Sequence, residues 1–178
     1  MSWQIDLSHS QVSFSVRHMM ISTVRGTFDT FSGTVDFDPE NPTAAQVEAT
    51  IDVTSINTRE AKRDEHLRSP DFFDVTNYPQ MTFKSTRVET TAPTKGKLYG
   101  DLTIHGITHE VVLDVNYHGQ AKSPWGTTSA GFSASTSIKR DDFDLKWNVA
   151  LETGGWLVGN DIKIEIELEV VEQVTEPA

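Results

Sequence analysis

Apolar and polar residues alternate along most of the chain. In residues 162–170, isoleucine, leucine or valine stands at every even position and lysine or glutamate at every odd position. Residues 98–104 and 111–117 show the same alternation on either side of a break at Gly106. Because successive side chains of a strand point to opposite faces, these patterns predict strands with one apolar and one wetter face, two of them joined in a hairpin.

Further strands follow the same rule. Alternation predicts strands in residues 3–7, 11–18, 47–53, 81–88 and 130–138. In residues 24–37 the apolar positions change from even to odd numbers, which predicts a bulge or sharp bend. About eight strands joined mostly by short turns favour a closed antiparallel up-and-down barrel over a sandwich, because closure removes exposed strand edges.

The chain between the strands predicts short helices and one longer loop. Residues 58–68 predict a helix with Asn57 and Glu60 as a capping box and with Asp64 pairing with Arg68. A helical turn capped by Asp141 is expected in residues 140–148, and residues 118–127 are predicted to form a loop.

Composition indicates one soluble domain over residues 1–172 with a flexible tail at 173–178. Of 178 residues, 37% are hydrophobic and 23% charged, and the formal net charge is -11. This acidity argues against nucleic acid, whose phosphates require lysine and arginine. There is no cysteine, which excludes disulfides, thiolate metal sites and a cysteine nucleophile. With no secretory signal and no apolar run long enough to span a membrane, we expect a cytoplasmic protein.

Few residues indicate catalysis or metal binding. His105 and His109 have a spacing that can hold a metal on a helix, but here they flank a turn, so two exposed histidines are expected. No serine-hydrolase elbow or phosphate-binding glycine loop is present. The densest charged cluster, in residues 63–68, is interpreted either as a solvated helix face or as a head-group contact at a barrel mouth. Neither a catalytic residue, nor a metal site, nor a cofactor is predicted.

Four ordered blocks resemble the YceI-like family of polyisoprenoid-binding proteins. They are W-x-I-D-x-x-H-S-x-V-x-F-S-V-R-H-M (residues 3–19), V-x-G-x-F-x-x-F-x-G (24–33), R-D-x-H-L-R-S-x-D-F-F-D-V (63–75, followed by Tyr78 and Pro79) and G-x-L-T-I-x-G-I-T (100–108). The resemblance implies an extended, lipocalin-like, eight-stranded antiparallel barrel with one or two short helices. It also implies an apolar pore for a long isoprenoid, and often a homodimer. Asp144 stands where family members commonly carry glycine.

The inward positions of such a barrel mix large side chains with small ones, Ala49, Gly100, Ala130 and Ala134. Small residues leave room for a channel, although large neighbours can also fill the space. We predict that the lumen wall contains Val16, Ile51, Phe83, Leu102, Leu113, Phe132, Ile138 and Ile164. The predicted head-group residues are Arg17, His18, Arg63 and His66.

The hypothesis from the sequence is therefore a non-enzymatic protein that binds a polyprenyl phosphate or an isoprenoid quinone for transport, storage or stress response. Two alternatives remain open. One is a metal-dependent or acid–base hydrolase with its site at the barrel mouth. The other is a structural dimer with a filled barrel.

Overall fold

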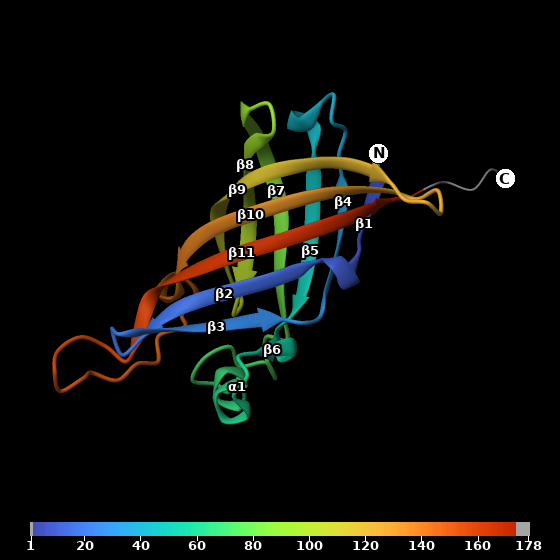
Figure 1. Cartoon of the computed structure of the whole chain (residues 1–178). Coiled ribbons are helices and arrows are strands. Elements are labelled where there is room, and N and C mark those ends of the chain that lie inside the picture. Colours follow the sequence, from blue (N-terminus) through green and yellow to red (C-terminus); the bar gives the residue numbers. More distant parts are fainter. Residues whose placement is uncertain (1, 174–178) are drawn as a thin grey trace.

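The computed structural model describes residues 2–173 and consists almost entirely of strands (Figure 1). The strands are β1 Ser2–Ile5, β2 Gln11–His18, β3 Ser22–Phe28, β4 Phe31–Asp36, β5 Gln46–Asp52, β6 Ile56–Asn57, β7 Gln80–Ala92, β8 Lys95–Ile104, β9 Ile107–Lys122, β10 Thr128–Lys139 and β11 Val158–Glu172. The helical elements are α1 Ala61–Arg68 and the 3-10 turns η1 Leu7–His9, η2 Pro42–Ala44, η3 Val53–Ser55 and η4 Arg140–Phe143.

Eight strands close into an antiparallel barrel, as predicted. They follow the order β1-β4-β5-β7-β8-β9-β10-β11, and β11 pairs back onto β1 through Trp3 and Glu172. Beside the ring, β2 pairs with the earlier part of β11, and β3 and β6 extend this edge. The pairs β1/β2 and β3/β4 therefore each behave as one long interrupted strand.

The predicted change of phase is a bend between β3 and β4. Here Asp29 and Thr30 leave the pairing with β2 and turn toward β1 and β5. The backbone N–H of Asp29 donates to the Ser55 carbonyl at 3.2 Å, and that of Thr30 donates to Ser55 Oγ at 3.0 Å. The corner is thus fixed by η3.

The barrel closes around a fully buried tryptophan. Trp3 packs with Val35, Phe37, Ala130 and Val170 in a cluster separate from the main core. Its indole N–H donates to the Phe37 carbonyl at 3.0 Å. This bond satisfies the buried indole where the first and last strands meet.

The predicted loop at 118–127 is too long, because β9 continues to Lys122 and β10 begins at Thr128, so that residues 123–127 alone connect the two strands. The backbone ladder of β9 with β10 persists through Lys122 and Thr128, although the side chains no longer alternate. Gly119, at φ 99°, and a register shift at Gly131 absorb the irregularity.

The capping predictions are also corrected. Glu60, rather than Asn57, caps α1 by accepting from the Arg63 N–H, and η4 has no side-chain cap from Asp141. Asp64 does not pair with Arg68 but accepts from the Thr58 backbone N–H at 2.9 Å. The bond from Thr58, which follows β6, thus replaces the predicted pair of Asp64 with Arg68 and ties α1 to the edge of the barrel.

Asp144, at the position where the resemblance implies a glycine, adopts the left-handed conformation at φ 58°, which glycine adopts without steric cost. The predicted tail lies outside the described residues except for Gln173, whose N–H donates to the Ser2 carbonyl at 2.9 Å. Among residues 2–173 no helix is long and apolar enough to cross a bilayer.

Candidate ligand cavity

The barrel encloses a cavity of about 400 Å³ whose wall is almost entirely apolar. The inward side chains of β5, β7, β8, β9, β10 and β11 supply most of this wall. Alternation therefore does two things at once. It buries an apolar face in every strand and gathers these faces around one shared space.

Seven of the eight residues predicted for the lumen wall line the cavity. They are Ile51, Phe83, Leu102, Leu113, Phe132, Ile138 and Ile164. Val16 does not line it. Val12 and Phe14 of the same strand do, but Val16 lies further along β2 toward the β2–β3 turn, opposite Ile162 and Val24. Contact of any of these residues with a ligand stays a prediction.

The small inward residues have different environments. Ala49 and Ala134 line the cavity. Gly100 is covered by the Phe83 ring so closely that an added Cβ would collide with it. Ala130 is buried in the Trp3 cluster. Interdigitation of large and small residues therefore fills part of the barrel but leaves the central space open.

The cavity reaches the surface at one end of the barrel. Exposed residues of the β7–β8 turn line it there, namely Thr90, Ala92, Pro93, Thr94 and Lys95. Pro39 and Pro42, from the segment between β4 and β5, line the same opening. Figure 1 shows the β7–β8 turn and η2 side by side at the top of the barrel. We call these residues, with Lys97, the rim.

Buried residues close the opposite end. Arg140 and Leu145, at η4 and just after it, form this floor together with Ile104 and Val111. The Arg140 guanidinium donates to the carbonyls of Gly159 at 2.8 Å, Trp147 at 3.0 Å and Val158 at 3.3 Å, and also to that of Leu145. Burial lowers the pKa of Arg140 from its ordinary value. With these acceptors, Arg140 serves to hold the segment after η4 across the floor.

The ionisable groups on the wall are few. They are Lys95, Lys97, Tyr117 and Arg140, and no carboxylate or imidazole belongs to the described lining. Neither lysine forms an ion pair with any residue between 2 and 173. Glu89, which lies opposite Lys97 in the ladder, is instead engaged by Arg87 and by the Tyr99 hydroxyl at 3.0 Å. The rim thus carries two lysines that form no ion pair among the described residues, although Lys97 lies between Glu89 of β7 and Asp114 of β9 in the ladder.

None of the four predicted head-group residues lines the cavity. Arg17 is exposed and donates to Thr23 Oγ1 and the Met20 carbonyl, both at 3.3 Å. His18 ends β2.

The two residues predicted on α1 make other contacts. Arg63 donates to the Thr58 side chain at 2.8 Å and to its carbonyl at 2.7 Å. His66 Nε2 lies 2.9 Å from an Asp71 carboxylate oxygen and packs edge-on against Trp147. The charged cluster of residues 63–68 therefore mainly joins α1 to its surroundings.

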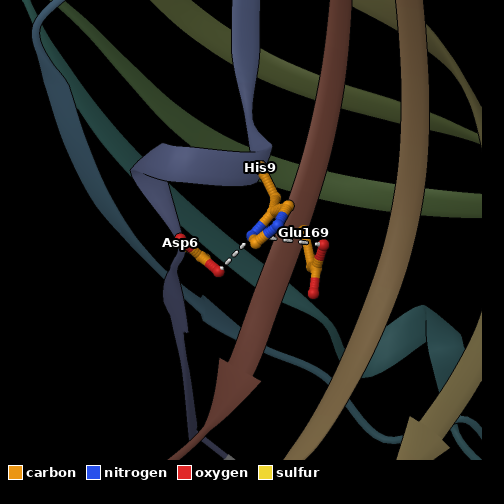
Figure 2. A group of neighbouring side chains, drawn as sticks. All are labelled: Asp6, His9 and Glu169. Carbon is orange, nitrogen blue, oxygen red and sulfur yellow. Dashed lines mark hydrogen bonds and ion pairs between the residues drawn. The ribbon is translucent and has the colours of Figure 1, made fainter. Parts of the chain in front are cut away.

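His105 and His109 do not converge on one point. His105 packs against Tyr78, with ring centroids 4.7 Å apart, and His109 packs against Phe143 at 5.3 Å. The structure instead groups Asp6, His9 and Glu169, which Figure 2 shows at the corner between β1 and β2. The D-x-x-H-S portion of the first family block contains this corner, but its spacing alone did not indicate Glu169.

This corner is an ion-pair and hydrogen-bond cluster. His9 Nδ1 lies 2.8 Å from Asp6 Oδ2 and 3.8 Å from Glu169 Oε2 (Figure 2). Hydrogen bonding to Asp6, assisted by the charge of Glu169, raises the pKa of His9. Hydrogen bonds from Ser8 and His9 lower the pKa of Asp6. Ser10 adds two bonds to the Glu169 backbone, so the cluster fixes the corner onto β11.

The fold and the cavity together define a class: a closed antiparallel barrel with an apolar internal space open at one end. The particular family is given by a family model, the YceI-like domain, which matches residues 3–170. The chain belongs to the YceI-like family.

Relatives in sequence cover most of the chain. It is 38% identical to the UPF0312 protein SA2479 of Staphylococcus aureus over 169 residues, which are 94% of this chain and 96% of the relative. It is 45% identical to Protein YceI of Shigella flexneri over 138 residues, 78% and 72% of the two chains.

Solved structures give the same assignment. BcnA of Burkholderia cenocepacia superposes with a TM-score of 0.80 at 27% identity, covering 93% of this chain and 98% of that one. The YCEI protein of Campylobacter jejuni gives 0.75 at 37% identity, covering 89% and 90%. A polyisoprenoid binding domain from Saccharophagus degradans gives 0.68 at 16% identity over 96% and 98%, a likeness of fold.

Proposed function

We propose that this protein is a non-enzymatic carrier that holds the isoprenoid chain of a lipid in its barrel. The single observation that carries the proposal is the apolar cavity, closed at Arg140 and open at the rim. A structural neighbour described as a polyisoprenoid binding domain supports the choice of ligand. Burial of apolar surface, about 25 cal/mol per Å², would supply the affinity.

The alternatives fit the site less well. A structural barrel requires a filled lumen, whereas this barrel contains about 400 Å³ of space. An acid–base hydrolase most often uses a carboxylate or an imidazole beside its substrate, and the described cavity wall has neither. Action in the cytoplasm and assembly as a homodimer stay predictions from the sequence.

The rim favours an anionic head group. Lys95 and Lys97 flank the opening and form no ion pair among the described residues, although Glu89 and Asp114 lie opposite Lys97 in the ladder. A phosphate at the end of a buried chain would meet these two ammonium groups there. A quinone would gain less from the same groups, because its oxygens carry no charge. Of the two ligand classes considered from the sequence, we therefore propose a polyprenyl phosphate.

The first test is to purify the protein, extract it with organic solvent and analyse the extract by mass spectrometry. We expect a prenyl lipid in the extract, or uptake of added geranylgeranyl phosphate by protein that has been stripped of lipid. A stripped protein that takes up neither geranylgeranyl phosphate nor geranylgeraniol would refute the proposal.

The second test separates the head group from the chain. In the double variant Lys95→Gln, Lys97→Gln, we expect roughly three- to tenfold weaker binding of geranylgeranyl phosphate, as befits exposed charge pairs. Binding of geranylgeraniol should not change. Lys62→Gln with Lys122→Gln removes the same charge from exposed positions outside the rim and is the matched control. Equal losses in both variants would contradict a specific role of the rim.

A further inference from the structure

The turn between β2 and β3 exposes three consecutive apolar side chains. Met19, Met20 and Ile21 are 43%, 57% and 79% exposed. Met19 and Met20 also have positive φ angles, 53° and 66°. Unbranched but bulky residues rarely adopt this conformation, so the turn combines backbone strain with exposed apolar surface.

A second loop brings further apolar side chains to the same place. The Met19 N–H donates to the Leu157 carbonyl at 2.8 Å, and the Met20 side chain lies against Gly155. This loop is a small hairpin in which Ala150 pairs with Trp156. Val149 and Trp156 are 46% and 56% exposed on it. We call Met19, Met20, Ile21, Val149 and Trp156 the apolar tip; Figure 1 shows both turns projecting from one side of the barrel.

The apolar tip combines two features that do not stabilise the folded chain, backbone strain and exposed apolar side chains. Neither strained methionines nor a cluster of exposed aliphatic and indole side chains adds to the stability of the chain on its own. Elsewhere the outer strand faces are strongly polar, as in the glutamates of β11. Such a coincidence indicates a surface that is covered when the protein acts.

We propose that the apolar tip docks on a lipid bilayer surface. Tryptophan, methionine and isoleucine on projecting turns are the side chains that enter the interfacial region of a membrane, the indole lying at head-group level. Residues 17–23 contain Arg17 and no acidic residue, and Arg17 forms no ion pair among the described residues. Glu152 is the one acidic residue between positions 145 and 158, where Lys146 is also present.

A second copy of the chain fits the apolar tip less well. The apolar tip consists of five exposed side chains, whereas a stable interface involves about 20–30 residues on each side. The surface also lies on two projecting turns instead of a flat sheet face (Figure 1). A bilayer accommodates such a convex shape, whereas two convex tips bury little area against each other. The inference does not depend on the proposed ligand.

The test is co-sedimentation of the full chain with vesicles of phosphatidylethanolamine and phosphatidylglycerol. We expect the wild-type protein to bind, and the double variant Ile21→Ser, Trp156→Ala to bind at least about tenfold more weakly. Trp125→Ala is the matched control, because Trp125 is 88% exposed but lies in the β9–β10 turn at the opposite side of the molecule (Figure 1). That variant should bind as the wild type does.

A second readout locates the contact. In a Trp125→Phe background, where Trp3 and Trp147 also emit, lipids brominated near the head group should quench the part of the emission that comes from Trp156. This quenching should disappear when Trp156→Phe is added. The inference is overturned if the wild-type protein does not sediment with vesicles, or if Trp125→Ala loses binding equally. It is also overturned if light scattering shows a dimer that the Ile21→Ser, Trp156→Ala variant converts to a monomer without any change in vesicle binding.

Discussion

Replacing Ala134 with phenylalanine should obstruct the cavity without unfolding the barrel. Ala134 lies on the wall in β10, opposite Val115 of β9 and Ile166 of β11. The new side chain would project into about 400 Å³ of open space. A well-packed interior would instead be overpacked by the same change.

The size of the effect follows from the number of carbons. Phenylalanine adds six carbons to alanine, about as many as one isoprene unit contributes to a ligand. Losing the burial of five ligand carbons costs about 4 kcal/mol at roughly 0.8 kcal/mol per carbon. A flexible ligand can slide toward the rim and recover part of this binding free energy. We therefore expect at least about tenfold weaker binding. The free energy of unfolding should change by less than about 1 kcal/mol.

The assay is a titration of lipid-free protein with geranylgeraniol, together with urea unfolding of the same preparation. Ser137→Phe is the matched control, because Ser137 is exposed on the opposite face of the same strand. Unchanged affinity in Ala134→Phe would refute a ligand in the cavity. Destabilisation by about 1–3 kcal/mol would show that the space is in fact packed.

Other predictions concern the ends and corners of the barrel. Asp144→Gly should raise the free energy of unfolding by about 0.5–1 kcal/mol in urea melts, because glycine adopts the φ of 58° without steric cost. Arg140→Met should lower it by roughly 3 kcal/mol, because buried carbonyls lose their donors, and thermal melts would detect the change. The raised pKa of His9 means that its pairing with Asp6 stabilises the fold fully below the ordinary histidine value of 6.5 and that this contribution is lost as the pH rises through the raised value. Asp6→Asn should therefore lower the His9 pKa in an NMR titration, and an unmoved titration would contradict the pairing.

Alternation predicted the barrel well because it is a property of single strands. Residues 162–170 show which face of β11 is inward before any partner strand is known, and the ladder with β10 and β2 preserves that assignment. The extension of β9 to Lys122 could not be found in this way. It depends on backbone hydrogen bonds with β10, which do not require alternating side chains.

The residues of the cavity wall could likewise be predicted from the sequence, whereas the position of the opening could not. Ile164 and Leu102 could be placed on the wall from their positions in strands, but the opening could not be placed. Pro93 and Lys95 lie in the polar segment between the strands predicted at 81–88 and 98–104, and only the closed barrel shows that this segment borders the cavity. Likewise, Asp64 was expected to pair within its helix, whereas its partner Thr58 precedes the helix and is positioned by the barrel edge.

The rim and the apolar tip lie at different parts of the barrel, which allows their roles to be separated. In Figure 1 the β7–β8 turn stands at the top of the barrel, whereas the β2–β3 turn projects to the side. Sites that share no residues and no partners contribute independently, so their effects should add. Lys95→Gln with Lys97→Gln should weaken phosphate binding but leave vesicle binding unchanged, and Ile21→Ser with Trp156→Ala should do the reverse. Loss of both properties in either variant would contradict the independence of the two sites.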